Sequence, residues 1–380
     1  MGTKLFSPKI TYLHSRLMPH LQFQAGHSGC NVERPFAMLN IISRKTSRRN
    51  CSVRASGISI EEMLSIGQLQ DQPPVDLEGF MDKVSLCNRG IEKKSEFLPF
   101  VVEKNIVGYI HPSIVEHLKQ FEDVFTIQST VEGQNAMFTN ETHINSFVTL
   151  HHQLKTADER TEAVGVAIKW LNKAGIILGL RNELNPVVLT FGGELLFSLE
   201  RAAVPYFGTK AYGVHMNGYV NIGGEKSLWI GKRSETKSTF PGMLDHLVAG
   251  GLPKGITCKE NMIKECSEEA GIPRNVAEMA VPVGAVSYED IYRNCFKRDV
   301  LFCYDLLLPH DFRPRNIDGE VERFMLVPVS QVANVIYKTK LYKPNCSLVI
   351  IDFFFRHGYI NPDQPGYLHL LQSLRRGECL

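Results

Sequence analysis

The stretch from residue 250 to residue 272 constrains this chain most, because it predicts a short helix with two dissimilar faces. Thr257 and Glu260 have the spacing of a capping box, and Gly271 marks the expected end of the helix. At about 100° per residue, four apolar positions form one stripe and three carboxylates form another. The apolar stripe is Met262, Ile263, Cys266 and Ala270, and the acidic stripe is Glu265, Glu268 and Glu269.

The acidic stripe needs a compensating charge, because neighbouring carboxylates on a helix repel one another. Lys264 supplies part of it. A hard divalent cation also suits the stripe, since Mg²⁺ prefers oxygen ligands and usually shares its shell with substrate phosphates. Taken alone, however, a three-glutamate helix is more simply a solvated acidic face.

The whole string resembles the Nudix box, whose pattern is G-x5-E-x7-R-E-U-x-E-E-x-G-U, with U a bulky apolar residue. The matching positions are Gly250, Glu265, Glu268, Glu269, Gly271 and Ile272. Lys264 stands for the box arginine and Cys266 for the bulky apolar residue. Ile256 stands where the first box glutamate belongs, which is a real departure from the pattern.

This resemblance implies an α/β fold, a Nudix α/β/α sandwich with a mixed sheet, behind a smaller α+β N-terminal domain. It also implies Mg²⁺-dependent (or Mn²⁺-dependent) cleavage of a small-molecule diphosphate by water. Glu265, Glu268 and Glu269 correspond to the metal ligands, with Glu268 and Glu269 also catalytic. Gly250, Lys264 and Gly271 are motif residues. A later loop often supplies the general base, which makes Glu320 a candidate, although a surface turn at Asp318-Gly319 is an equal alternative.

A wider resemblance extends over roughly residues 75–360. The segments 212–219, 228–237 and 239–251 are similar to the thiamin-pyrophosphokinase-related Nudix family, as are Arg181-Asn-Glu-Leu184 and Glu200-Arg201 before them. The family implies hydrolysis of thiamin diphosphate analogues, the oxo and oxythiamin forms, to the monophosphate. Three residues are candidates for substrate binding: Arg233 and Lys237 for phosphate, and Tyr288 for stacking on a ring, with a solvated loop or core packing as alternatives.

Three other functions compete with this interpretation. Isopentenyl-diphosphate isomerase shows a similar Phe-Pro-Gly run, but its catalytic cysteine is missing from residues 243–249. The chain would otherwise be a hydrolase of another nucleoside-diphosphate-linked substrate, or a Nudix-like binding module without turnover.

The N-terminal segment, residues 1–56, differs in charge from the rest of the chain. It has nine Lys and Arg residues against the single acid Glu33, while the chain as a whole has a net charge of +2. A basic, hydroxyl-rich and nearly acid-free leader is typical of an organelle transit peptide. We expect a chloroplast (plastid stroma) location, with the mitochondrion or an uncleaved basic tail as alternatives.

The remaining chain is expected to form four parts. Residues 57–74 are a short helical segment and linker, 75–205 an α+β substrate-recognition domain, 206–360 the Nudix hydrolase domain, and 361–380 a C-terminal extension. Periodicity predicts a helix over 159–172, with Ala163, Val166, Ala167, Trp170 and Leu171 on one face. Further elements are expected as follows: strands in 97–110 and at 187–191, 212–222, 227–232, 244–249, 300–308 and 324–328, and helices at 58–69, 113–122 and 345–355.

Composition excludes several classes of function. The nearly balanced charge gives no indication of a nucleic-acid partner. No apolar run approaches the roughly 20 residues that cross a bilayer, and the best one, residues 348–355, contains Asp352. The nine cysteines are irregularly spaced without a C-x-x-C pair, so neither a disulfide framework nor a zinc site is predicted. The sequence indicates no oligomeric state.

Overall fold

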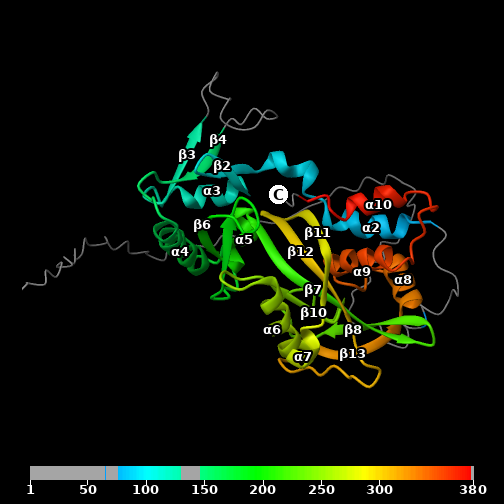
Figure 1. Ribbon diagram of the computed structural model, residues 1–380. Helices are drawn as coiled ribbons and strands as arrows, with labels where there is room; N and C mark the ends of the chain where they lie inside the picture. Colours follow the sequence, from blue (N-terminus) through cyan, green and yellow to red (C-terminus); the bar gives the residue numbers. More distant parts are fainter. Residues whose placement is uncertain (1–64, 66–75, 130–145, 378–380) are drawn as a thin grey trace, which may run out of the picture. The chain divides into compact units, whose positions relative to one another are not determined.

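The computed structural model describes residues 65, 76–129 and 146–377. The predicted leader therefore lies outside the described residues. So does the predicted helix at 58–69, apart from Ser65. Figure 1 shows the described elements.

The C-terminal region is built on a seven-stranded mixed sheet. Its main path runs β11-β12-β7-β8-β13, and β10 pairs with β7 while β9 pairs with β8. β7 and β12 are parallel and the other neighbours are antiparallel. The mixed sheet agrees with the expected fold class. The strands are β7 (Lys210–Ile222), β8 (Glu225–Arg233), β9 (Leu244–Asp245), β10 (Val248–Gly251), β11 (Val281–Tyr292), β12 (Cys295–Leu307) and β13 (Val321–Pro328).

Helices cover both faces of this sheet (Figure 1). On one face, α6 (Cys258–Ala270) and α7 (Arg274–Ala277) pack on a core that includes Val214 and Met216 of β7. On the other face, α8 (Val329–Lys338) and α9 (Pro344–Arg356) pack on Leu228 and Ile230 of β8. Burial on both faces explains why residues 300–307 of β12 are apolar apart from Asp305.

Two segments that are far from the sheet in sequence join the core under α8 and α9. Phe80 and Val84 of α2 (Glu78–Cys87) pack with α8 and α9, and so do Leu370 of α10 (Tyr367–Ser373) and Leu374. Residues that the sequence divides between an N-terminal domain and a C-terminal extension thus share one core with the sheet. The domain boundaries themselves stay predictions.

The N-terminal module has its own four-stranded sheet, in the order β2-β1-β4-β3. A separate hairpin, β5 (Leu184–Val188) with β6 (Leu195–Glu200), packs with α4 (Ala157–Lys173) on the module's own hydrophobic core. The other elements are η1 (Ile91–Glu96), β1 (Leu98–Val102), β2 (Asn105–Ile110), α3 (Pro112–Leu118), β3 (Phe125–Ser129), β4 (Ser146–Leu150), η3 (Arg201–Ala203) and α5 (Val204–Phe207).

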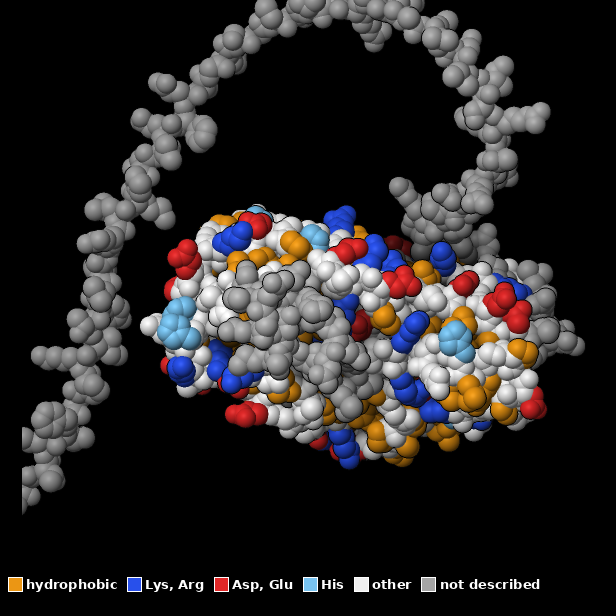
Figure 2. Space-filling view, turned by 90° about the horizontal axis from the view of Figure 1, so that it is seen from above, with side chains coloured by type: hydrophobic (Ala, Val, Ile, Leu, Met, Phe, Trp, Pro, Cys, Tyr) orange, Lys and Arg blue, Asp and Glu red, His pale blue; other side chains and the backbone are white. Residues whose placement is uncertain are grey.

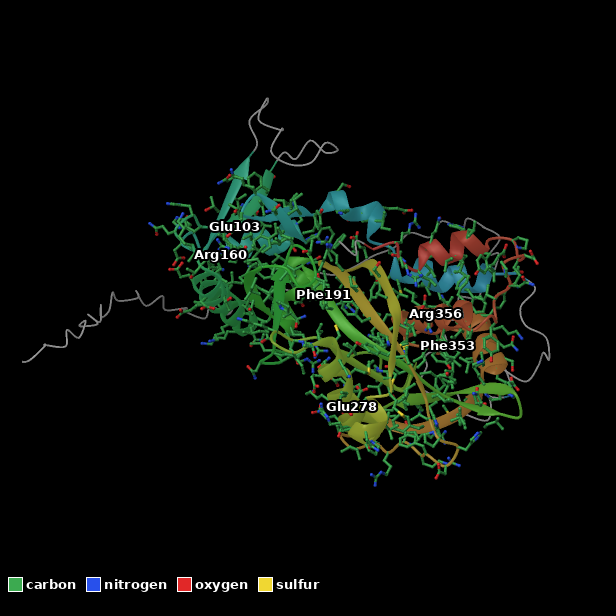
Figure 3. All side chains as sticks on the ribbon, in the orientation of Figure 1. Glu103, Arg160, Phe191, Glu278, Phe353 and Arg356 are labelled. Atoms are coloured by element: carbon green, nitrogen blue, oxygen red, sulfur yellow. The ribbon has the colours of Figure 1, made fainter. Side chains whose placement is uncertain are left out.

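The predicted helix at 159–172 is confirmed as α4, but its predicted buried face is only partly right, since Ala167 and Leu171 are buried and two other members are not. Val166 is 57% exposed and Trp170 is 39% exposed, whereas Arg160 is buried. Arg160 turns inward because its guanidinium donates to three backbone carbonyls and pairs with Glu103 at 2.6 Å, an arrangement labelled in Figure 3. A buried arginine with this many partners joins the inward face that Val164 and Ile168 form, so that face is rotated from the predicted one.

The remaining expected elements are largely confirmed. The strand expected at 244–249 is two short strands, β9 and β10, because His246 and Leu247 do not have strand structure. The strands β3, β4, β6 and β11 and the helices α2, α8 and α10 were not among the elements predicted from the sequence.

Among the described residues, no helix is long and apolar enough to cross a membrane. The apolar run at 348–355 is part of α9 and is almost wholly buried in the core. On the face shown in Figure 2, acidic and basic side chains are intermixed on the surface that the described residues form.

Candidate active site

The acid-bearing helix α6 begins and ends where the sequence predicts. Thr257 Oγ1 accepts the Glu260 backbone N–H at 3.2 Å, and Gly271 has the left-handed conformation that ends the helix (φ 62°). The reciprocal half of the capping box is replaced, because the Glu260 carboxylate bonds instead to Arg274 Nη2 at 2.9 and 3.1 Å. The predicted apolar stripe is buried, so the sheet fixes the rotation of the helix.

Gly250 allows Glu265 to lie against strand β10. A Cβ added at Gly250 would overlap the carboxyl group of Glu265. Burial raises the pKa of Glu265, although Lys264 beside it acts in the opposite direction. The first glycine of the motif thus gives a carboxylate close access to backbone at the strand end.

Glu269 is held by the same strand. Its Oε2 accepts the backbone N–H of Ala249 at 2.8 Å. Burial raises the pKa of Glu269 well above its ordinary value, and the nearby charges of Asp245, Glu265 and Glu320 raise it further. A partly buried carboxylate that faces other acids is an unfavourable arrangement unless a cation joins it.

Lys264 partly compensates the acidic stripe. Its Nζ lies 2.6 Å from Glu268 Oε2 and 3.4 Å from Glu265 Oε1. Glu268 is half exposed, and its carboxylate is turned towards this lysine. Lys264 therefore supplies the positive charge that the box arginine would supply, but as a point charge without a planar fork.

Glu320 lies in the loop before β13, within electrostatic range of Glu269. Its carboxylate forms an ion pair with Lys237, and its backbone carbonyl accepts the Ser234 N–H at 2.9 Å. The structure thus brings the predicted base and one predicted phosphate ligand together beside the acidic helix. Gly319, at φ 82°, forms the turn that the alternative interpretation expects.

Arg233 is largely engaged within the protein. Its guanidinium donates to the carbonyls of Phe240 and Thr239 and to Asp245 Oδ2, at 3.0 to 3.1 Å. These bonds fix the loop from residue 234 to residue 243.

Tyr288 is a core residue. It is 3% exposed, its hydroxyl donates to Asp299, and it belongs to the cluster under α8 and α9 rather than the one under α6. Burial raises its pKa well above the ordinary value. The structure thus places Tyr288 away from the acidic helix, in the core-packing role that the sequence analysis gave as the alternative.

The N-terminal module covers the loop that precedes α6, a relationship that the sequence analysis did not foresee. Ile256 and Val188 of β5 pack on a small cluster of Tyr212, Leu252 and Val300. Phe191, labelled in Figure 3, lies 4.9 Å from Tyr212 between ring centroids. Ile256 therefore has an apolar environment, which accounts for the absence of the usual glutamate. In the sequence, the only indication of this apolar contact was Ile256 itself, an apolar residue at a position where the motif has glutamate.

A second unforeseen feature is a buried polar cluster behind the strand end. His215 Nδ1 lies 2.8 Å from His246 Nε2, and Cys346 Sγ lies 2.6 Å from Asp245 Oδ1. Burial lowers the pKa of both imidazoles, that of His246 to about 4. No sequence spacing indicates this cluster, because its members come from β7, β9, the β9–β10 connection and α9.

Among the described residues, His215, His246 and Cys346 form a group whose ligand atoms lie within 4.8 Å of one another. The donor types would suit zinc. Arg233 and Lys343, however, lie 3.0 and 3.5 Å from the adjoining Asp245 and place two positive charges there. Burial opposes ionisation of Asp245, yet these cations hold its pKa below the usual range. We therefore interpret the cluster as a hydrogen-bonded core that fixes the strand leading to Gly250.

A mixed sheet between helix layers, with three glutamates on a helix that follows a Gly-Gly strand end, defines a protein of the pyrophosphohydrolase class. The NUDIX domain model matches residues 217–345, and a domain of unknown function, DUF4743, matches residues 79–211. The chain belongs to the Nudix hydrolase family.

Two relatives from Arabidopsis thaliana support this assignment. "Nudix hydrolase 20, chloroplastic" is 55% identical over 337 residues, covering 89% of this chain and 88% of the relative. "Nudix hydrolase 24, chloroplastic" is 56% identical over 304 residues, 80% of each chain. Both names agree with the predicted chloroplast location. Among solved structures, the Deinococcus radiodurans protein DR0079 is 19% identical with a TM-score of 0.36, over 45% of this chain and 98% of that one.

Proposed function

We propose that this Nudix hydrolase removes the terminal phosphate from oxo- and oxythiamin diphosphate and releases the monophosphate. The substrate class comes from the resemblance of segments 212–219, 228–237 and 239–251 to the thiamin-pyrophosphokinase-related family. The acidic helix supports a diphosphate substrate, because a metal bound there would be shared with phosphate oxygens.

The donor set fits Mg²⁺ or Mn²⁺. Glu269 is partly buried and faces other carboxylates, and Glu265 is largely desolvated, so a divalent cation would relieve an otherwise uncompensated charge. Glu265, Glu268 and Glu269 would hold it. When bound, the cation would neutralise the diphosphate and acidify a coordinated water.

The chain's own residues perform the remaining tasks. Glu320 accepts the proton of the attacking water, with Glu268 as the other carboxylate able to do so. Lys237 leaves its ion pair with Glu320 to contact a phosphate oxygen. Lys237 is better placed for this than Arg233, whose guanidinium already bonds two carbonyls and Asp245.

An isomerase function is disfavoured by the position of the cysteines. Residues 243–249 contain none. Cys346 lies next to Asp245, but it is fully buried, and burial together with Asp245 raises its pKa well above the ordinary value. A buried, protonated thiol is unsuited to acid–base work on a substrate.

A substrate panel tests the proposed function. The full chain is assayed with Mg²⁺ for phosphate release from oxythiamin diphosphate, thiamin diphosphate, ADP-ribose and ADP, with phosphatase coupling where the product is a phosphate ester. We expect the highest kcat/KM for oxythiamin diphosphate. A preference for ADP-ribose would contradict the thiamin assignment and favour a nucleoside-diphosphate-linked substrate. Thermal stabilisation by a ligand without turnover of any compound would indicate a binding module.

A further inference from the structure

The N-terminal module bridges the two loops that frame the acidic helix. On one side, the Lys254 N–H donates to the Leu184 carbonyl at 2.9 Å, which joins the loop before α6 to β5. On the other side, Arg181 Nη2 donates to Ser238 Oγ at 3.0 Å, in the same loop as Lys237. The module thus reaches both borders of the site.

Arg201 lies at the centre of this bridge. Its backbone N–H donates to the Glu183 carbonyl at 2.8 Å, and its Nη1 lies 3.1 and 3.2 Å from the two Glu183 carboxylate oxygens. These bonds hold one end of the guanidinium against Glu183. The Arg201 side chain is nevertheless 44% exposed, so it remains accessible to a ligand.

The guanidinium rests on Gly251, the second glycine of the strand end. A Cβ added at Gly251 would lie 2.9 Å from Arg201 Cζ and Nη2. Successive residues of a strand face opposite sides, so Gly250 makes room for Glu265 and Gly251 makes room for Arg201. The two glycines therefore bring an acid of α6 and a base of the N-terminal module to the same strand end. They are close enough that the charge of Arg201 acts on Glu265.

We propose that Arg201 is a substrate-binding residue, contributed by the N-terminal module, whose guanidinium binds a diphosphate oxygen outside the ligand shell of the cation. A planar guanidinium presents a fork of N–H donors that matches phosphate oxygens. Glu183 is the positioning residue that holds the fork in place. The proposal rests on the diphosphate-hydrolase function but not on which diphosphate is hydrolysed. It gives the N-terminal module a direct part in the active site.

Binding of methylenediphosphonate, a diphosphate that cannot be hydrolysed, tests this role. Its Kd is measured by calorimetry with the full chain and Mg²⁺ for the unsubstituted protein, R201M, R201K and R89M. R201M keeps the apolar stem, and R201K keeps the charge without the fork. Arg89 is the matched control, because it is 53% exposed and forms two bonds of 2.8 Å with Asp290. Unfolding temperatures show whether each variant is folded.

We expect Kd to rise about 10-fold or more in R201M, the factor for losing one hydrogen bond between charged groups, and less in R201K. R89M should bind like the unsubstituted chain. Equal affinity in R201M and R89M, whether unchanged or equally weakened, would overturn the proposal. Binding that depends on Arg201, without hydrolysis of any thiamin analogue, would refute the thiamin assignment and leave the role of Arg201 standing.

Discussion

The carboxyl group of Glu265 occupies the space that a side chain at Gly250 would need. G250A should therefore push Glu265 out of place and lower kcat about 100-fold, since small displacements of active-site groups have effects of this size. Phosphate release with Mg²⁺ measures the change. Gly165 is the contrasting position, because it lies in α4 with open space around it. G165A should keep full activity and raise the free energy of unfolding by up to about 1 kcal/mol.

Substitution of Glu268 tests the acidic stripe. E268Q should fold normally and lose about 1000-fold in kcat, because a catalytic divalent cation contributes several kcal/mol and 1.4 kcal/mol is tenfold in rate. The matched control is E260Q on the same helix, whose carboxylate bonds to Arg274. Activity should be measured over a Mg²⁺ series. A rate in E268Q equal to that in E260Q would show that Glu268 is no metal ligand.

Restoring the usual acid at position 256 should harm the protein. Ile256 packs with Val188 on the cluster at Leu252, so I256E would place a charged group in apolar surroundings. We expect a loss of about 2 kcal/mol in the free energy of unfolding, measured with urea, and no gain in kcat. I256L should be close to neutral. A more active I256E would mean that the box glutamate is compatible with the covering module.

Acid should destabilise the protein through His246. Burial lowers its pKa from 6.5 to about 4, with Lys343 and Arg233 acting in the same direction and Asp245 in the opposite one. Between these values the unfolded chain binds a proton that the folded protein does not. Above about pH 6.5 neither state is protonated at His246, so this residue does not affect stability there. As the pH drops from 6.5 towards 4, the free energy of unfolding falls by about 3 kcal/mol.

Urea midpoints at pH 7, 5.5 and 4.5 measure this effect. H246N removes the titrating group, so its stability should fall less steeply than that of the unsubstituted chain over the same interval. Parallel curves for the two proteins would contradict the burial of a neutral imidazole at this position.

Much of the fold and of the site could be predicted because the relevant signals are local. The limits of α6 follow from Thr257 and Gly271, and its rotation follows from the spacing of apolar residues such as Met262 and Cys266. For α4 the same reasoning wrongly placed Val166 and Trp170 on the buried face. It also missed the burial of Arg160, which depends on carbonyls up to 36 residues away. Similarly, the core-packing role of Tyr288 is evident only once the helices on the opposite face of the sheet are known, because Tyr288 packs beneath them.

The sequence by itself determined the acidic stripe on α6, the strand end at Gly250 and the family to which the chain belongs, since each depends on spacing within about 25 residues. Only the tertiary structure decided what surrounds them. Ile256 is apolar because a distant module buries its loop, and Arg201 reaches the strand end because Gly251 has no side chain. Such contacts join residues that are far apart in the chain, and helix or strand periodicity has no information about them.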